Sequence, residues 1–410
     1  MNTLKFITAG NVDDGKSTLI GRLLYDSNSI HTDQLGVLEK RKSNSDDEID
    51  LSLITDGLRA EREQGITIDV AYKYFSTAKR KFIIADAPGH EQYTRNMITG
   101  ASNSELIIIL VDARKGVTTQ TKRHASIGSL MGIKKAIVVV NKIDLVGYSE
   151  DTFLAIKKEF ESLQSQLNYD EVIFIPASAL VGDNIVDKSS KTPWYNGNTL
   201  LNVLENITID NNTDLTARFQ VQWVIRPKDE ENHDYRGYAG QILSGVYNVG
   251  DEVKILPSNI ISKISKIERN LVEVKKAEAG ENIVLHFEND IDISRGDTIV
   301  KINEEPINSN DLKAWVCWLD SNALQQGKTY LLQHRFHSVR TKIKTIDQQW
   351  DINNWEFISS DEIKLNDIAQ IGLKTNQPLF FDLFEENTTT GNAILIDETT
   401  NNTVAALMFI

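Results

Sequence analysis

The chain has 410 residues, of which 40% are hydrophobic and 25% are charged, so it is long enough for two or three globular domains. Its formal net charge of −14 argues against sequence-independent nucleic-acid binding, and no apolar run reaches membrane-spanning length. The single cysteine, Cys317, excludes an internal disulfide, and the start at Met1 shows no signal-peptide pattern. We therefore expect a cytoplasmic protein with no nucleic acid and no membrane as partner.

The first motif of the chain is a phosphate-binding loop. A short apolar run over 4–7 predicts a strand, and apolar residues at helical spacing over 19–24 predict a helix. Between them lies Gly10-Asn11-Val12-Asp13-Asp14-Gly15-Lys16-Ser17, which fits G-x-x-x-x-G-K-[ST]. A strand that leads through this turn into a helix points backbone N–H groups at one place, where triphosphate oxygens fit. We predict that Lys16 reaches the β- and γ-phosphates, that Ser17 ligates Mg²⁺, and that Thr18 belongs to the same site.

A nucleotide-sensing segment is expected after the polar stretch 30–50. The sequence Gly65-Ile66-Thr67 stands just before a strand predicted over 70–75. After a phosphate loop, this is where a segment that orders around the γ-phosphate belongs. We predict that Thr67 closes over the γ-phosphate and Mg²⁺ in the triphosphate state only.

The next strand, over 82–85, ends at Asp86-Ala87-Pro88-Gly89-His90. An aspartate at a strand end opposite the phosphate loop can hold Mg²⁺ through water. Gly89 can bring its N–H close to the γ-phosphate, and its backbone permits a conformational change. We predict that His90 points at the attacking water, the alternative being a histidine without a catalytic role.

The base-recognition motif follows two further strands. The run 106–111 is nearly all aliphatic, as in a parallel strand that is buried on both faces, and a helix is expected around 119–131. The strand 136–140 then ends at Asn141-Lys142-Ile143-Asp144, an N-K-x-D motif. A carboxylate accepts hydrogen bonds, so Asp144 suits the N1–H and amino group of guanine, whereas adenine offers no such donor pair.

The last strand of this region, over 172–176, leads to Ser178-Ala179-Leu180, whose backbone can contact the guanine O6. All these motifs stand at strand ends, where α/β sheets bind their ligands. Together they predict a Mg·GTP-binding domain with a doubly wound, mostly parallel α/β sheet over residues 1–208. The rival dinucleotide-binding fold needs G-x-G-x-x-G after the first strand, and the chain lacks it.

The second half of the chain reads as all-β. A polar linker is expected at 210–213, followed by short strands and frequent turn signals such as Val249-Gly250-Asp251 and Arg295-Gly296-Asp297. We predict two β-barrel domains, over 213–308 and 309–410. Cys317 lies in the apolar run 314–319 and is expected to be buried and structural.

This motif order resembles the translational GTPases of the elongation factor Tu and 1A type. Within that class the chain is most similar to the family of bacterial sulfate adenylyltransferase large subunits. The resemblance covers essentially the whole chain; its specific blocks are 12–26, 33–35, 61–72, 89–97, 226–227, 236–240 and 390–397. The charged insert 228–234 departs from the family pattern and is interpreted as a longer hairpin.

The resemblance implies a GTP- and Mg²⁺-dependent regulatory subunit that forms a heterodimer with a small, catalytic subunit. That partner would make adenylyl sulfate and diphosphate from ATP and sulfate, driven by GTP hydrolysis here. Carried over from elongation factors, Val12 and Ile66 are expected to form an apolar gate before His90. Two alternatives stay open: a translation factor that delivers aminoacyl-tRNA, and a GTP-dependent scaffold without a metabolic partner. The phosphate loop argues against a translation factor, because the bacterial elongation factor has His and Thr at the positions of Asp14 and Ser17.

Overall fold

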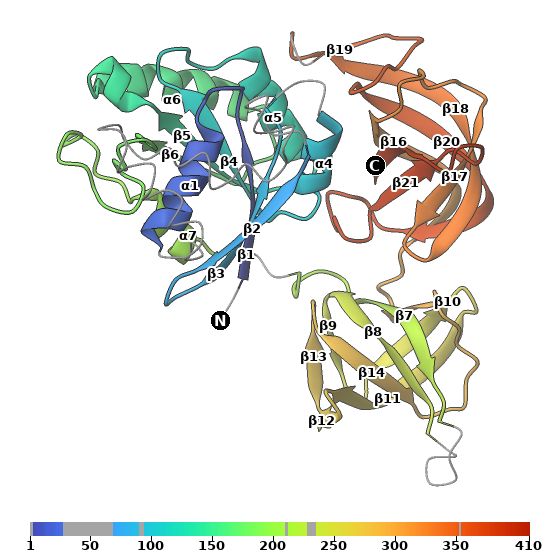
Figure 1. Ribbon diagram of the computed structural model, residues 1–410. Helices are drawn as coiled ribbons and strands as arrows, with labels where there is room; N and C mark the ends of the chain where they lie inside the picture. Colours follow the sequence, from blue (N-terminus) through green and yellow to red (C-terminus); the bar gives the residue numbers. More distant parts are fainter. Residues whose placement is uncertain (1–2, 28–68, 90–93, 210–211, 228–234, 352–353) are drawn as a thin grey trace. The chain divides into compact units, whose positions relative to one another are not determined.

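The computed structural model describes residues 3–27, 69–89, 94–209, 212–227, 235–351 and 354–410 (Figure 1). The chain divides into two compact units that meet in sequence between Ile209 and Asp210. The first unit contains an α/β sheet, and the second contains the remaining sheets. Each unit is described by itself.

The first unit is built on a six-stranded sheet with the strand order β2-β3-β1-β4-β5-β6. Only the edge strand β2 runs antiparallel to its neighbour, and the other pairs are parallel. The predicted mostly parallel sheet is therefore confirmed. The strands are β1 (Thr3–Ala9), β2 (Ala71–Ser76), β3 (Lys81–Asp86), β4 (Leu106–Asp112), β5 (Lys135–Asn141) and β6 (Glu171–Pro176).

Helices follow the strands and begin where the sequence supplies a cap. The Thr118 side chain accepts from the Thr121 N–H while Thr121 bonds back, and this capping box begins α5. Ser149 and Thr199 cap α6 and α7 through their hydroxyl groups. The helices are α1 (Lys16–Asp26), α4 (Thr94–Ala101), α5 (Thr119–Leu130), α6 (Glu150–Gln164), α7 (Leu200–Asn206) and the short 3-10 helix η3 (Ile143–Val146).

The strand β4 shows why this sheet needs helices on both faces. All seven of its residues are buried, and successive side chains of a strand point to opposite faces. Leu106, Ile108 and Leu110 share one core with apolar residues of α1 and α7. On the other face, Gly128 of α5 lies against Ile107. The sheet is thus covered on both sides, as expected for a doubly wound fold (Figure 1).

The second unit contains two closed antiparallel barrels, each with its own apolar core. In the first, β10 pairs with both β15 and β11, which closes the sheet β10-β15-β7-β8-β14-β11. In the second, β17 pairs with both β21 and β18, which closes the sheet β17-β21-β22-β16-β20-β18. The predicted pair of β-barrels is confirmed, and the sheet changes between Lys301 and Ile307.

The strands of the first barrel and its small accessory pairs are β7 (Arg218–Ile225), β8 (Gly237–Ser244), β9 (Val246–Asn248), β10 (Glu252–Leu256), β11 (Ile260–Arg269), β12 (Val272–Val274), β13 (Lys276–Glu278), β14 (Asn282–Phe287) and β15 (Thr298–Lys301). Those of the second are β16 (Ile307–Trp318), β17 (Thr329–His334), β18 (His337–Asp351), β19 (Glu356–Ile358), β20 (Ile368–Phe381), β21 (Asn392–Ile396) and β22 (Thr403–Phe409). The insert 228–234 lies outside the described residues.

Cys317 is buried in β16, as predicted, and burial raises the pKa of its thiol to about 12. A thiol in this state is structural, because the reactive form is the thiolate. In the described part of the chain, no helix is both long enough and apolar enough to cross a membrane.

The close approach of α5 to the sheet can be tested at Gly128. A Cβ atom at this position would lie 2.5 Å from the Tyr169 Oη and 2.9 Å from the Ile107 Cδ1. We expect Gly128→Ala to destabilise the protein by about 1–3 kcal/mol through overpacking, measured by urea unfolding. Thr119→Ala, an exposed position on the same helix, is the control. Equal stability of the Gly128 variant and the wild type would contradict this packing.

Candidate functional site

The phosphate loop joins β1 to α1 and is held by its own backbone and side chains. Gly15 stands at the N-cap of α1 with a φ of +95°, which glycine adopts without strain. The Asn11 N–H donates to the Asp14 carboxylate over 2.7 Å, and the Asp14 N–H donates to the Asn11 carbonyl over 3.2 Å. Burial raises the pKa of Asp14, whose Oδ1 has no hydrogen-bond partner in the described structure. The loop is therefore shaped before any ligand is considered.

Lys16 places a buried ammonium group inside this loop. Its Nζ donates to the Gly10 carbonyl over 2.9 Å and to the Asn11 carbonyl over 3.2 Å. Burial lowers the pKa of Lys16, while the nearby carboxylates of Asp86 and Asp14 oppose this shift. A buried cation needs oxygen partners, and here the loop carbonyls supply them.

Asp86 and Gly89 meet the loop from the end of β3. The parallel register aligns Thr8 with Asp86, and the Thr8 hydroxyl donates to Asp86 Oδ1 over 3.3 Å. A Cβ atom on Gly89 would lie 2.4 Å from the Lys16 Nζ and 2.6 Å from the Gly10 carbonyl oxygen. Only glycine lets the backbone come this close to the loop. Ala87 and Pro88, which stand between Asp86 and Gly89 in the sequence, are both buried.

Gln120 and His124 of α5 support Gly89, and the sequence motifs did not indicate either. The Gln120 amide donates to the Gly89 carbonyl over 3.3 Å and lies 3.1 Å from the His124 Nε2. Arg123 donates to the other end of the amide over 3.0 Å, which fixes its orientation. Burial, followed by the charges of Lys16 and Arg123, lowers the pKa of His124 to about 3. The ring is thus neutral at ordinary pH.

Asn141 joins the phosphate loop to the loop after β6. Its Nδ2 donates to the Asp14 carbonyl over 2.7 Å, and its Oδ1 accepts from the Ala179 N–H over 2.9 Å. A Cβ atom on Gly15 would lie 2.4 Å from the same Nδ2. The Ala179 N–H is therefore engaged by the protein, which leaves Leu180 as the unbonded backbone donor of the predicted tripeptide within the described structure.

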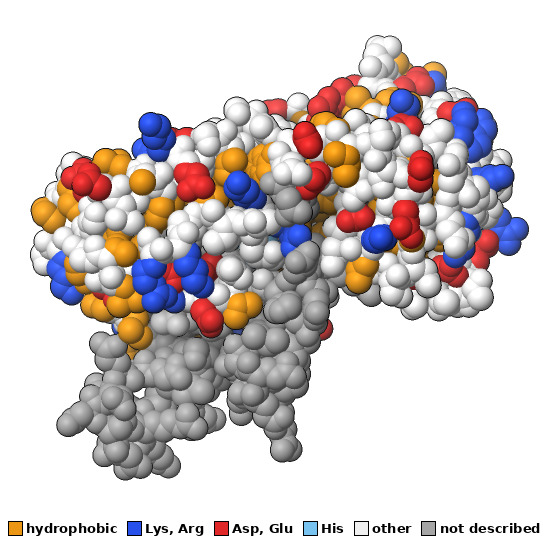
Figure 2. All heavy atoms as spheres, turned by 90° about the horizontal axis from the view of Figure 1, so that it is seen from above, with side chains coloured by type: hydrophobic (Ala, Val, Ile, Leu, Met, Phe, Trp, Pro, Cys, Tyr) orange, Lys and Arg blue, Asp and Glu red, His pale blue; other side chains and the backbone are white. Residues whose placement is uncertain are grey.

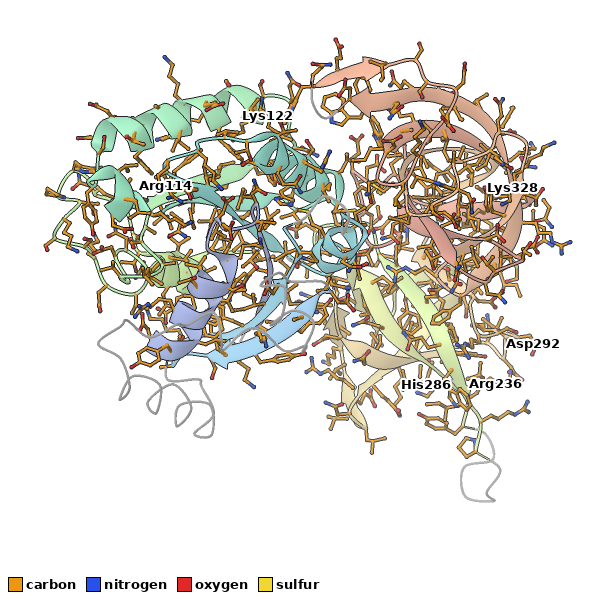
Figure 3. All side chains as sticks on the ribbon, turned by 45° about the horizontal axis from the view of Figure 1, so that its top comes forward. Arg114, Lys122, Arg236, His286, Asp292 and Lys328 are labelled. Carbon is orange, nitrogen blue, oxygen red and sulfur yellow. The ribbon has the colours of Figure 1, made fainter. Side chains whose placement is uncertain are left out.

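Lys142 and Asp112 form a charged edge beside the loop. Lys142 adopts a φ of +60°, and its Nζ donates to the Asp13 carbonyl and lies 3.1 Å from Asp112 Oδ2. The guanidinium of Arg114, which is labelled in Figure 3, donates two hydrogen bonds of 3.0 and 2.6 Å to the same carboxylate. Burial alone would raise the pKa of Asp112, but the hydrogen bonds from Arg114 and Lys142 outweigh it and hold that pKa well below its usual range.

Asp144 is half-buried in η3, and its carboxylate accepts no hydrogen bond from another described residue. The loop beside it, from Ser178 to Leu180, is held by Arg22 of α1. The Arg22 guanidinium donates to the Ala179 carbonyl over 3.2 Å and also to the Leu180 carbonyl. The Ile143 N–H donates to the Ala177 carbonyl over 3.2 Å, which joins η3 to the loop after β6. A carboxylate on η3 can accept hydrogen bonds from a planar base.

The structure therefore brings all the described candidate residues to the carboxyl ends of β1, β3, β5 and β6. Thr67 and His90, together with Ile66, lie outside the described residues. Arg22, Asp112, Gln120 and His124 are additions that the motifs did not reveal. Only Asp112 carried a signal, since it ends a strand on the ligand side of the sheet.

The residues present fit Mg²⁺. Asp86 is a buried carboxylate whose charge acts on Lys16, and Ser17 follows Lys16 in the first turn of α1. In the described ranges there is no cluster of three or more His, Cys, Asp or Glu side chains suited to a metal. Mg²⁺ needs none, because it usually takes one or two protein ligands and completes its shell with phosphate oxygens and water.

The buried neutral His124 predicts a loss of stability in acid. Its pKa is about 3 in the folded state and about 6.5 in the unfolded state, so between these values the unfolded chain binds a proton that the folded chain does not. The free energy of unfolding should fall as the pH drops below about 6.5, by up to about 1.4 kcal/mol per pH unit from this histidine.

His124→Gln should reduce the slope of the free energy of unfolding against pH, measured by urea unfolding between pH 7.5 and 5. Lys122→Gln on the same helix removes no histidine and should keep the wild-type slope, and an unchanged slope in the His124 variant would contradict the assignment.

Comparison with known proteins identifies the family. Residues 1–210 match the Elongation factor Tu GTP binding domain, and residues 311–409 match the GTP-eEF1A C-terminal domain-like family. The chain is 50% identical to sulfate adenylyltransferase subunit 1 of Buchnera aphidicola, over 99% of this chain and 86% of that protein. It is 48% identical to the bifunctional enzyme CysN/CysC of Mycobacterium tuberculosis, over 99% of this chain and 67% of that protein.

A solved structure shows the same fold at low identity. It is the S. cerevisiae Ski7 GTPase-like domain bound to GTP, which is 18% identical, covers 100% of this chain and 97% of that chain, and has a TM-score of 0.51. The sequence matches carry the assignment, because they extend over nearly the whole chain at close to half identity. The chain belongs to the sulfate adenylyltransferase subunit 1 family of elongation factor Tu-type GTPases.

Proposed function

We propose that this chain hydrolyses Mg·GTP and uses that reaction to drive the formation of adenylyl sulfate by a small partner subunit, in a cytoplasmic heterodimer. The observation that carries the GTPase part is the Lys16 ammonium, buried in a preformed loop and facing Gly89. The partner and the coupled reaction rest on the family relationship. The carboxylate of Asp144, in the short helix η3 whose Ile143 N–H bonds to the Ala177 carbonyl, supports guanine as the base.

The phosphate end of the site accounts for binding a triphosphate. The Lys16 Nζ is held by two carbonyl oxygens of the loop. Phosphate oxygens carry full charge and make stronger, charge-assisted hydrogen bonds than carbonyls, so the triphosphate would replace these partners. The N–H groups that begin α1 add a further anion site. Mg²⁺ would bind to Ser17, to Asp86 through water, and to Thr67, and would supply charge neutralisation on the phosphates.

For the chemical step we propose His90, Gly89 and Thr67. Thr67 would sense the γ-phosphate, the Gly89 N–H would contact it, and His90 would orient the attacking water behind an apolar gate of Val12 and Ile66. The close approach of Gly89 to Lys16 supports this assignment, since a Cβ atom on Gly89 would lie 2.4 Å from the Lys16 Nζ. A change at a γ-phosphate bound to Lys16 would therefore act close to the Gly89 backbone. The bond from Gln120 gives the Gly89 peptide a fixed orientation in the present state.

The reason for coupling is chemical. A phosphosulfate anhydride is more reactive than the phosphoanhydride that is spent to make it, so ATP and sulfate by themselves give little adenylyl sulfate at equilibrium. GTP hydrolysis on this chain would pull the reaction forward. The partner can respond only if it has unequal affinity for the GTP and GDP states, and linkage then requires it to change GTP affinity or turnover here.

A translation factor that carries aminoacyl-tRNA is the second candidate, because the fold is shared with such factors. On the face seen in Figure 2, Lys and Arg side chains are interspersed with Asp and Glu, and the formal net charge of −14 gives no electrostatic support for RNA binding. The close similarity to sulfate adenylyltransferase subunit 1 argues the same way. Absence of tRNA from the protein purified from its native cell would separate the two.

Base recognition is tested with Asp144→Asn. Loss of the carboxylate should weaken GTP binding by about 2–4 kcal/mol, because two donors of guanine lose a charged acceptor. Xanthosine triphosphate should bind the variant better than the wild type, since its extra carbonyl matches the new amide donor. Fluorescent-nucleotide titration measures both affinities. Full GTP affinity in the variant would show that Asp144 does not read guanine.

Coupling is tested with the same variant in the complex reconstituted with the small subunit. Adenylyl sulfate and phosphate are measured together at fixed ATP and sulfate. The wild type should raise the adenylyl sulfate yield with GTP and not with xanthosine triphosphate, and Asp144→Asn should reverse that preference. Lys16→Ala should assemble but give no increase with either nucleotide, because the phosphates lose their cation. Equal yields with and without GTP in the wild type would refute coupling and leave only a GTP-binding subunit.

A further inference from the structure

One backbone donor in the loop after β6 is left without a partner. The Ala179 N–H donates to the Asn141 Oδ1 over 2.9 Å, and the Val181 N–H donates to the Ser178 hydroxyl over 3.3 Å. Between them, the Leu180 N–H has no acceptor in the part of the chain that the structure describes. Leu180 is 46% exposed, whereas Ala179 before it is buried. The Leu180 N–H is therefore the backbone donor of this stretch that is available to a ligand.

Arg22 of α1 fixes the peptide unit that carries this donor. Its Nε donates to the Ala179 carbonyl over 3.2 Å, and its Nη2 donates to the Leu180 carbonyl. The Ala179 carbonyl and the Leu180 N–H belong to one trans peptide unit, in which these two groups point in opposite directions. Because Arg22 binds the carbonyl, the N–H of the same unit is held facing away from the guanidinium.

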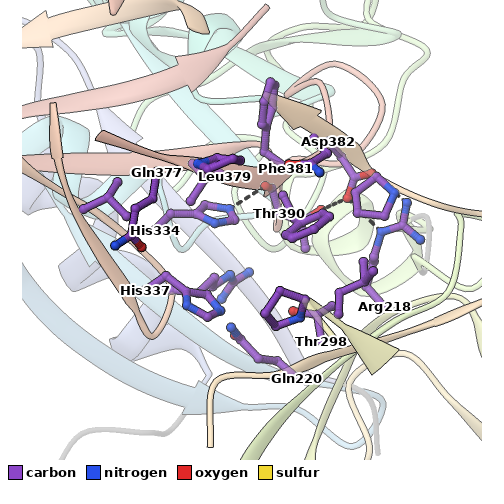
Figure 4. A pocket seen from close by; sticks show the side chains of 18 of the residues that line it. Arg218, Gln220, Thr298, His334, His337, Gln377, Leu379, Phe381, Asp382 and Thr390 are labelled. Carbon is purple, nitrogen blue, oxygen red and sulfur yellow. Dashed lines mark hydrogen bonds and ion pairs between the residues drawn. The ribbon is translucent and has the colours of Figure 1, made fainter. Parts of the chain in front are cut away.

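Arg218 of the first barrel presents the same edge of its guanidinium to a carboxylate instead. Its Nε and Nη2 donate to the two oxygens of Asp382 over 3.0 and 2.7 Å, in the pocket that Figure 4 shows. Arg22 uses these two nitrogens for two successive carbonyls, although Asp26 lies one helical turn away. The Asp26 carboxylate lies 3.7 Å from the remaining nitrogen, Nη1. The charge of Arg22 is thus paired through Nη1, while its two-pronged edge holds the loop backbone.

The free donor belongs to the same hydrogen-bonded frame as the base motif. Asn141 begins that motif and accepts from the Ala179 N–H, and the Ile143 N–H donates to the Ala177 carbonyl over 3.2 Å. Guanine carries an acceptor, O6, and two donors, N1–H and the 2-amino group, on one edge. An ionised carboxylate can only accept, so Asp144 serves the two donors. Recognition of O6 therefore needs a donor from another residue.

We propose that Arg22 is a positioning residue for base recognition, which presents the Leu180 N–H to the O6 of guanine. The inference rests on the proposed GTPase function and names the part of the site that selects a 6-oxo purine over a 6-amino purine. The bonds from the charged guanidinium hold the peptide and also polarise it, which makes its N–H a stronger donor. Without Arg22, the peptide would be free to turn its carbonyl toward the base, where it would repel O6 and accept from a 6-amino group.

The test is competition binding to the full chain at pH 7 with Mg²⁺, with fluorescent GDP as the reporter and three diphosphates that differ only in the base. GDP has O6 and the 2-amino group, inosine diphosphate has O6 without the 2-amino group, and 2-amino-ADP has an amino group in place of O6. Arg22→Gln should weaken GDP and inosine diphosphate by a similar factor of at least about tenfold, because both lose the fixed donor to O6. The variant should bind 2-amino-ADP no more weakly than the wild type does.

Two further variants separate the carbonyl bonds of Arg22 from its charge. Arg22→Lys keeps the charge but lacks the planar fork, so it should lose less GDP affinity than Arg22→Gln. Asp26→Asn removes the ion pair and leaves the carbonyl bonds in place. It is the matched control and should bind all three diphosphates as the wild type does. A wild-type circular dichroism spectrum and a cooperative urea transition show that a variant is folded.

An equal loss of affinity for all three diphosphates in the folded Arg22→Gln variant would indicate a general loosening of the loop and would overturn the inference. Wild-type GDP affinity in that variant would overturn it as well. Both results leave the proposed GTPase function intact, because the wild type still binds GDP. Failure of the wild type to bind GDP would instead contradict the proposed function, and this inference with it.

Discussion

The buried ammonium of Lys16 is the constraint around which the first unit is organised. A cation at this depth needs oxygens on several sides, and the loop supplies two carbonyl groups only because its backbone folds back on itself. That turn requires the left-handed conformation of Gly15 and the Asp14 carboxylate that accepts from the Asn11 N–H. The sequence of the loop is thus explained by the electrostatics of one side chain.

The parallel sheet transmits this constraint to the base end of the site. Parallel strands place their carboxyl ends along one edge, so residues from distant parts of the chain meet there. Asn141 is the connection, since one amide bonds to the phosphate loop and to the loop after β6. A movement of the phosphate loop would therefore displace Asn141 and with it Ala179. Arg22 of α1 donates to the Ala179 carbonyl, so the displacement would extend to α1. Phosphate recognition and base recognition share one hydrogen-bonded frame.

The sequence predicted this frame well because its parts are local. Each of these signals depends on a few neighbouring residues: the spacing of glycine and lysine, the end of a strand, or an aliphatic run. As predicted, Gly10–Ser17 follow β1, and Asp86 and Asn141 end β3 and β5. Gln120 and His124 could not be predicted in this way. Their role depends on α5 packing close to the sheet, which Gly128 permits, and helix packing over distance leaves no pattern in a single sequence. The salt bridge between Arg218 and Asp382 escaped prediction for the same reason, since it joins two barrels across 164 positions.

Buried positive charge is stabilised in two ways in the described part of this chain. Lys16 is 8% exposed, and its ammonium group is held by two backbone carbonyls, whose partial charge offsets only part of the cost of burial. Arg218 shows that the chain can supply a full carboxylate where neutrality is wanted, because Asp382 pairs with it through two hydrogen bonds. A cation left with carbonyls alone is therefore a selective arrangement, and it is chemically incomplete until an anion binds. On this reasoning, the charge of Lys16 makes the phosphate loop a ligand site, whereas the pair of Arg218 and Asp382 is already neutral and needs no ligand.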